Sequence, residues 1–205
     1  MKHTLLIITA LLFITSAVFP QSKMDIDNLI DMDGLLYKPN DDKPYTGKVF
    51  DLYDNAQKKF DGRYRSGLRN GKWTWWSEGG KMGSLGTYKN GIKDGKWTRW
   101  YENGQKKEEA TFKDGKEDGL YTSWYENGQK EKEGTYKDGK EDGLKTYWNE
   151  YGQVVEETVF DLGNLMNRKE YDYYPTGEVY TIETNDGIIT YYSIKGEIEK
   201  ETKNG

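Results

Sequence analysis

Two consecutive stretches, GKWTRWYENGQKKEEATFKDGKED at residues 95–118 and GLYTSWYENGQKEKEGTYKDGKED at residues 119–142, are near-copies of each other. Glycines continue the same 24-residue spacing on either side of them. They stand at Gly47, Gly71, Gly95, Gly119 and Gly143, and a second set stands at Gly67, Gly91, Gly115, Gly139 and Gly163. A fixed period of this length indicates a tandem repeat.

Each repeat contains two turn signals. Glu-Asn-Gly-Gln at residues 102–105 and Lys-Asp-Gly-Lys at residues 113–116 hold dipeptides that tolerate the positive φ of a type I′ turn. The segments between the turns are rich in Trp, Tyr, Thr and Phe, which favour strands. Tight turns at both ends of each strand predict an all-β fold. We expect tandem 24-residue β-hairpin repeats that form an elongated, twisted, single-layer antiparallel meander.

Strand alternation places aromatic side chains on both faces of this sheet. One row shares its face with a row of threonines: Trp76, Trp100, Trp124 and Trp148. The opposite face receives Trp73, Trp97 and Tyr121. These seven are candidate binding-face aromatics, suited to stack on sugar rings or to anchor a partner protein. The alternative is that they only support the sheet through cross-strand contacts.

A small residue recurs shortly before the aromatic residue of each second strand. Gly62, Gly86 and Gly134 occupy this position, and Ala110 and Thr158 replace glycine in the other two units. A small residue here predicts that a bulky neighbouring side chain lies across the backbone.

Composition alone leans toward disorder, because only 34% of residues are hydrophobic and 32% are charged. The 17 Tyr, 7 Trp and 6 Phe argue instead for a thin sheet held by aromatic pairs. The formal net charge is −5, with lysines and acidic residues interleaved. We therefore expect no nucleic-acid partner, since phosphate binding needs a positive patch, and no strong membrane binding by the mature chain.

The residue types needed for much of enzyme chemistry are missing from the chain. It has no cysteine, and its one histidine, His3, lies in the signal peptide that we predict below, so the mature chain would have neither residue type. Catalysis by Ser-His-Asp or Cys-His groups and the usual transition-metal sites are thereby excluded. The acidic turn at residues 114–119 lacks the ligand pattern of a calcium loop, and Glu108 and Glu109 point to opposite faces of a strand. We expect a non-enzymatic protein with no cofactor, no metal site and no catalytic residues.

Residues 1–22 read as a signal peptide. Lys2 precedes the apolar run LLIITALLFI at residues 5–14, which is too short to span a bilayer comfortably. Cleavage is expected after Ala17, or alternatively after Gln21 or Ser22. An uncleaved membrane anchor is the other interpretation. The signal predicts an exported protein that is periplasmic, on the outer surface or secreted.

The strings G-x-W-x-x-W-Y-E-N-G-Q and Y-K-D-G-K-x-x-G resemble bacterial MORN-type repeats, and more specifically the YwqK antitoxin family. Asp33-Gly34-Leu35-Leu36-Tyr37 and Pro44-Tyr45-Thr46-Gly47-Lys48-Val49 are similar to the start of such arrays. The resemblance implies a repeat sheet used for protein interaction, and the antitoxin label implies neutralisation of a partner toxin by binding. MORN repeats elsewhere are associated with scaffolding, dimerisation and suspected lipid contact.

These observations divide the chain into four parts. A signal peptide (1–22) is followed by an N-terminal segment with a first hairpin (23–46), the repeat array (47–166) and degenerate repeats that cap it (167–205). We expect a protein-interaction or scaffold protein of the cell envelope or exterior. The alternatives are a surface glycan-binding module and an antitoxin-like neutraliser of a toxin.

Overall fold

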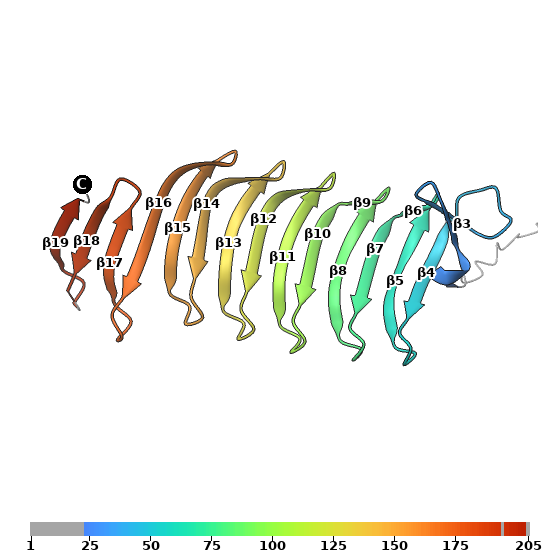
Figure 1. Cartoon of the computed structure of the whole chain (residues 1–205), viewed down its shortest axis with the longest axis horizontal. Helices are drawn as coiled ribbons and strands as arrows, with labels where there is room; N and C mark the ends of the chain where they lie inside the picture. The colour runs from blue at the N-terminus through green and yellow to red at the C-terminus, as the bar shows by residue number, and fades with distance from the viewer. Residues whose placement is uncertain (1–22, 194, 204–205) are drawn as a thin grey trace, which may run out of the picture.

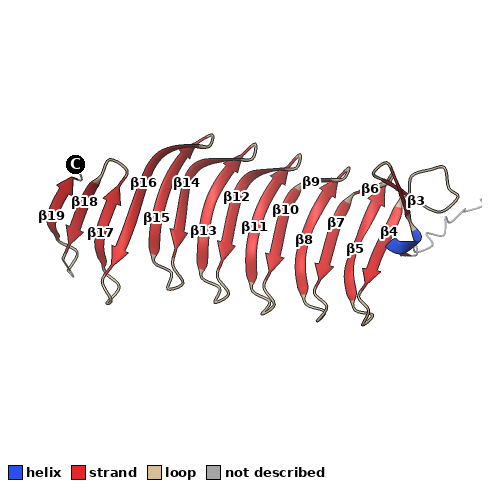
Figure 2. Ribbon diagram, viewed as in Figure 1, coloured by secondary structure: helices blue, strands red, loops and turns tan. Residues whose placement is uncertain are grey.

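The computed structural model describes residues 23–193 and 195–203 (Figure 1). They form a 17-stranded sheet and a separate two-stranded one. From β4 to β19 the strands follow one another along the long axis, with turns along both edges (Figures 1 and 2). The predicted signal peptide lies outside the described residues. No helix among the described residues has the length and apolar character to cross a bilayer.

The strands are short and regularly spaced. Their bounds are β1 (Met24–Asp25), β2 (Ile30–Met32), β3 (Leu35–Tyr37), β4 (Gly47–Leu52), β5 (Lys58–Arg65), β6 (Leu68–Arg69), β7 (Gly71–Trp76), β8 (Met82–Lys89), β9 (Ile92–Lys93), β10 (Gly95–Trp100), β11 (Lys106–Lys113), β12 (Lys116–Trp124), β13 (Lys130–Lys137), β14 (Lys140–Trp148), β15 (Val154–Asp161), β16 (Asn164–Tyr173), β17 (Val179–Thr184), β18 (Ile188–Tyr192) and β19 (Ile198–Lys203). One 3₁₀ turn, η1 (Ile26–Asn28), lies near the start.

The pairing confirms the predicted meander. Within one unit β10 and β11 run antiparallel, from Gly95 opposite Phe112 to Trp100 opposite Lys106. The next unit joins through β11 and β12, also antiparallel. This pattern continues to β18 and β19. Two strands per unit lengthen the sheet by about 10 Å.

The Asp-Gly turns are the predicted type I′ hairpins. Asp114 and Gly115 both adopt positive φ, 48° and 86°, and the flanking Lys113 and Lys116 face each other across the hairpin. Leu162 occupies the position of Asp114 in the turn between β15 and β16, with φ 47°. A leucine in this conformation is strained, since the left-handed region suits Gly, Asn and Asp.

The Asn-Gly turns differ from the predicted type I′ geometry. Gly104 has positive φ, 86°, but Asn103 does not enter the left-handed region. The N–H of Gly104 donates to the Tyr101 carbonyl at 2.9 Å, and that of Tyr101 donates to the Gln105 carbonyl at 2.9 Å. The loop is therefore a tight turn followed by a left-handed glycine. Asn103 keeps ordinary φ because its Oδ1 accepts from the Gln105 N–H at 2.9 Å.

Hydrogen bonds join successive units at both edges of the sheet. We call the two long sides of the sheet, where the turns lie, the Asn-Gly edge and the Asp-Gly edge after their turns. At the Asn-Gly edge, Asn103 Nδ2 donates to the Glu126 carbonyl at 2.7 Å, and the Tyr101 hydroxyl donates to the Trp124 carbonyl at 2.7 Å. At the Asp-Gly edge, the Gly115 N–H donates to the Lys93 carbonyl at 3.0 Å. Each unit is thus fixed to the next by the strand ladder and by its turns.

The predicted approach of a bulky side chain to a small residue is confirmed at two tryptophans. A Cβ added to Gly62 would lie 2.2 Å from the ring atom Cδ2 of Trp73. Gly86 relates to Trp97 in the same way, also at 2.2 Å. The indole rings lie directly on the neighbouring strand. Trp97 is 8% exposed, and Trp73, which also belongs to the core under the N-terminal segment, is fully buried. At Ala110, the next position of this kind, the opposing residue is Tyr121.

The N-terminal segment adds a local second layer over the first hairpin. β1 pairs in parallel with β4, a pairing that the meander prediction did not include. Tyr45, Val49, Tyr64 and Trp73 form the buried core there, and Met24, Ile26, Leu29 and Leu36 pack against it. The end of the sheet that would otherwise stay open is covered, as repeat arrays require.

The sheet continues past residue 163 through β16 to β19. Turns at Tyr174–Glu178 and Ser193–Glu197 repeat the hydrogen bonds of the Asn-Gly turns: Gly177 N–H donates to the Tyr174 carbonyl at 2.9 Å, and Gly196 N–H to the Ser193 carbonyl at 2.8 Å. These two segments therefore keep the hydrogen bonds of the Asn-Gly turn although their sequences differ from the repeat.

Replacement of Gly62 by alanine should destabilise the protein by about 2 kcal/mol, because the added methyl group must displace the buried Trp73 ring. Ala110→Gly, at the same repeat position, should cost only about 0.5–1 kcal/mol through backbone entropy. Urea unfolding followed by tryptophan fluorescence measures both. An equal cost for the two changes would contradict the packing described above.

Leu162→Asn should stabilise the protein by about 0.5–1 kcal/mol, since asparagine tolerates the left-handed conformation better than leucine. Asn90 already holds this turn position in an earlier unit, with φ 52°. Leu165→Asn is the matched control, because Leu165 is similarly exposed but lies in a strand. Thermal unfolding should show a higher midpoint for the first variant only.

Candidate functional site: the two faces of the sheet

The two faces of the sheet carry different side chains. We call one the aromatic face; its main residues are Tyr64, Trp73, Trp75, Tyr88, Trp97, Phe112, Tyr121 and Tyr136. We call the other the threonine face; it carries Thr74, Thr98, Thr122, their lysine and glutamate neighbours, and the row Trp76, Trp100, Trp124 and Trp148. The predicted division of the aromatics between faces agrees with these contacts.

The rings of the aromatic face pack on one another. Trp73 lies 5.7 Å from Trp75, and Tyr88 stands edge-on to Trp97 at 5.1 Å. The indole N–H groups of Trp73 and Trp97 are satisfied as well, since they donate to the carbonyls of Arg63 at 3.2 Å and Thr87 at 3.1 Å. Sequence reasoning did not include Trp75 in this row, although its position two residues after Trp73 places it on the same face.

Cations cover the tryptophans from the Asp-Gly edge. The guanidinium of Arg69 lies 4.8 Å from the Trp73 ring, and Lys93 Nζ lies 4.5 Å from that of Trp97. Burial and the nearby Arg99 lower the pKa of Lys93. Trp73 is fully buried and Trp97 is 8% exposed. These two candidate binding residues are therefore packing residues and offer no open ring to a ligand.

The aromatic column changes character along the array. The residues at successive units are Trp73, Trp97, Tyr121 and Lys145. Lys145 is buried, bonds to Glu141, and lies 5.3 Å from the Tyr147 ring and 5.9 Å from that of Phe160. Burial lowers the pKa of Lys145, but the hydrogen bonds to Glu141 and Tyr147, together with the nearby Tyr136, outweigh burial and raise that pKa. A paired ammonium thus takes the place of an indole in this column.

The threonine face is held by small ionic networks. Glu109 accepts from Lys96 at 2.6 Å and from Lys106 at 2.8 Å, and the Thr98 hydroxyl donates to it at 3.5 Å. The next unit repeats the pattern, with Glu133 bonded to Lys130 and Thr122. Burial disfavours the Glu109 charge, yet the two lysines outweigh it and lower the pKa of this carboxyl.

The second tryptophan row lies along the Asn-Gly edge of this face. Trp76, Trp100, Trp124 and Trp148 are all half-buried. Lysines lie over three of the rings: Lys58 over Trp76 at 5.4 Å, Lys106 over Trp124 at 5.3 Å, and Lys130 over Trp148 at 5.4 Å. This row, together with the half-buried Tyr121, is the accessible part of the predicted set.

The net charge of each repeat unit falls steadily from the first unit to the last. The net charge of the whole chain does not show this gradient. The 24-residue units that begin at Gly47, Gly71, Gly95, Gly119 and Gly143 carry +3, +2, 0, −2 and −3. On the threonine face, Lys48, Lys72 and Lys96 occupy one column, and Leu120 and Leu144 continue it. The array is therefore positively charged at its first units and negatively charged at its last units. The sequence prediction of evenly interleaved charge did not include this difference.

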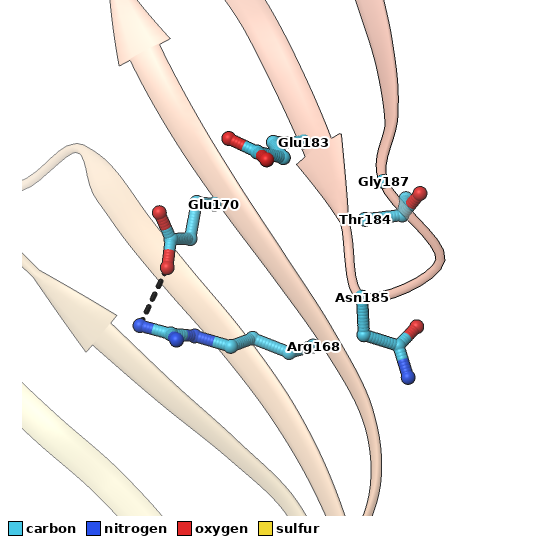
Figure 3. Close-up of a pocket in the computed structure, with 6 residues that line it drawn as sticks. All are labelled: Arg168, Glu170, Glu183, Thr184, Asn185 and Gly187. Atoms are coloured by element: carbon cyan, nitrogen blue, oxygen red, sulfur yellow. Dashed lines mark ion pairs between the residues drawn. The ribbon is translucent and has the colours of Figure 1, made fainter. Parts of the chain in front are cut away.

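A shallow hollow on the later part of the sheet is lined by Arg168, Glu170, Glu183, Thr184, Asn185 and Gly187 (Figure 3). Glu170 lies opposite both Glu156 and Glu183 in the sheet. Arg168 bonds Glu156 at 3.1 Å and Glu170 at 2.5 Å, which relieves the repulsion between like charges. The Arg168 guanidinium is therefore already paired with carboxylates of the sheet. Among residues 23–193 and 195–203, no group of three His, Cys, Asp or Glu side chains is placed to hold a metal ion.

Comparison with known families agrees with the repeat geometry. The family described as "MORN repeat variant" matches residues 69–90, 93–114 and 117–138. The chain therefore contains three consecutive MORN repeats of the variant type. The second and third matches each span one Asn-Gly loop, and the first spans the corresponding Gly79-Gly80 loop. The matches end at Asn90, Asp114 and Asp138, the first left-handed residue of each following turn, so they follow the repeat of the sheet. MORN repeats are generally non-enzymatic and suit a binding or scaffold protein.

No curated protein matches the chain. Among solved structures, a similar chain belongs to the "crystal structure of GtfA/B complex bound to UDP and GlcNAc". It shares 11% identity, with a TM-score of 0.23 over 53% of this chain and 22% of that chain. A likeness of this size carries no conclusion about function.

Acid should weaken the threonine-face network. Because the folded pKa of Glu109 lies below its usual value of 4.5, its contribution to stability is present above that value and is lost as the pH falls through the folded pKa. Glu109→Gln should therefore reduce the fall of the urea midpoint between about pH 5 and pH 3. Glu126→Gln, in an exposed turn, is the control. A profile unchanged by Glu109→Gln would show that the network contributes nothing.

Proposed function

We propose that this protein is a non-enzymatic interaction protein of the cell envelope or exterior, and that it binds a partner protein on the threonine face of its later repeats. The observation that carries the proposal is the change of Lys72 and Lys96 to Leu120 and Leu144 in one column. Leu120 is 51% exposed and Leu144 is 53% exposed. Exposed apolar side chains that gather into one patch mark a protein-binding surface.

The neighbouring strands extend this apolar surface. Val159 lies directly opposite Leu144 and is 39% exposed. Thr135 lies opposite Leu120 in the same way and separates the two leucine strands. We call Leu120, Leu144 and Val159 the apolar patch. The sheet beneath it is bonded strand to strand and turn to turn, so a partner would meet a preformed surface and binding would cost little ordering entropy.

The export part of the proposal is supported by residues 1–22, whose charged start and apolar run are those of a signal peptide. The non-enzymatic part is supported by the general character of MORN repeats and by a composition with no cysteine and with His3 as its single histidine.

Leu144→Lys should abolish most partner binding while leaving the fold intact, because lysine already occupies this column at Lys72 and Lys96. We expect at least a tenfold loss in recovery of the partner from envelope extracts, which corresponds to about 1.4 kcal/mol. Thr111→Lys adds the same charge to the same face in an earlier unit and should leave recovery unchanged. Equal recovery with both variants would place the partner elsewhere and refute the proposal.

A further inference from the structure

The opposite end of the threonine face carries three cations without carboxylate partners. Lys48 and Arg63 lie directly opposite each other on β4 and β5. Together with Lys72, on β7, they line a shallow hollow at this end of the sheet, separate from the one in Figure 3. Among the described residues none of the three forms an ion pair. We call Lys48, Arg63 and Lys72 the basic patch.

The carboxylate that lines this hollow is already paired with other lysines. Asp61 also lines the hollow, but it bonds Lys23 at 2.7 Å and Lys58 at 3.5 Å. The two additional lysines leave the surroundings of the basic patch more positive. Like charges directly opposite in a sheet are destabilising, so the arrangement of Lys48 and Arg63 costs free energy that a bound anion would offset.

Comparison between repeats shows that this charge is local. One unit later Lys96 is neutralised by Glu109 at 2.6 Å. At the position of Glu109 the unit of Lys72 has Leu85, which lies opposite Thr74. At the position of Arg63 the following units have Thr87, Thr111 and Thr135. The other units therefore do not bring unpaired cations together in this way. The basic patch is a departure from the repeat pattern.

An aromatic ring completes the hollow. Trp76 and Met82 line it beside the cations, and Trp76 is half-buried, with Lys58 at 5.4 Å from its ring. A flat apolar ring next to several donors fits a ligand that is itself a ring bearing anionic groups. The positive region ends within two units, because later units are neutral or acidic. A short segment of ligand is thus favoured over a long polyphosphate backbone or a flat membrane surface.

We propose that the basic patch binds an acidic oligosaccharide, whose carboxylate or sulfate groups are held by Lys48, Arg63 and Lys72 and whose sugar ring packs against Trp76. This site lies at the other end of the face from the apolar patch, so its ligand and the partner protein bind independently.

Calorimetric titration of the chain from residue 23 onward with hexagalacturonate tests the proposal. We expect binding that weakens with added salt, and no binding of the neutral cellohexaose. The variant Lys48→Gln, Arg63→Gln, Lys72→Gln should lose about 10- to 100-fold in affinity, as expected for three partly exposed ionic contacts. It should fold, because the substitutions relieve repulsion between cations. A control, Lys113→Gln, Lys137→Gln, Lys140→Gln, removes the same charge from exposed positions of later units and should change affinity less than twofold.

The aromatic contact has its own pair of variants. Trp76→Leu should weaken hexagalacturonate binding about tenfold, while Trp148→Leu, the equivalent change at the acidic end, should have no effect. Hexaglutamate and hexathymidylate serve as competitors of other chemical classes. The proposal is overturned if hexagalacturonate does not bind, if the triple basic-patch variant binds it normally, or if either competitor binds as tightly as the sugar.

Discussion

The structure depends on one packing contact, an indole ring laid across a glycine of the adjacent strand. A single-layer sheet has no second layer to bury its side chains, so burial must be found within the layer itself. Trp73 over Gly62 and Trp97 over Gly86 solve this problem. Each ring covers backbone on one side and is covered in turn by Arg69 or Lys93 on the other. The sheet thus obtains buried apolar surface from a chain that is poor in aliphatic residues.

The later units do not repeat this indole-on-glycine contact. Where Ala110 or Thr158 replaces glycine, the residue opposite is Tyr121 or Arg168. Gly134 keeps the glycine, but Lys145 lies opposite it in place of an indole. This lysine is a buried ammonium held by Glu141 among aromatic rings. The array therefore grades from an aromatic interior to an ionic one along its length, and the net charge of the units changes with it.

Much of this architecture could be predicted from the sequence. The 24-residue period, the strand alternation and the small residue beside each aromatic residue are local patterns, and local patterns set a meander in which neighbours in sequence are neighbours in space. The type I′ prediction was right for Asp114-Gly115, where the turn is set by two φ angles. It was wrong for Asn103-Gly104, because the asparagine side chain bonds to Gln105 and to the next unit.

The surface was harder to predict than the fold. Trp73 and Trp97 looked equivalent to Trp76 and Trp100 in sequence, yet the first pair is buried and the second is half-buried. Cations lie over rings of both rows, but only Trp73 and Trp97 also lie on a glycine of the adjacent strand, and alternation alone does not reveal that difference. The parallel pairing of β1 with β4 was also beyond reach, since it joins Met24 to Val49 without a turn signal. The patches that distinguish one end from the other arise from deviations between units, which a search for the shared pattern averages away.

The hydrogen bonds between strands run along the long axis of the molecule, and this gives the array a mechanical character. A pull on its two ends loads these bonds one strand after another, because consecutive strands are joined covalently only by their turns. Each unit that opens releases 24 residues and lengthens from about 10 Å to about 80 Å. Its neighbours keep their own ladders and turn contacts, and the released unit can pair again with them once the tension falls. Under such a load the array would lengthen in steps of one repeat.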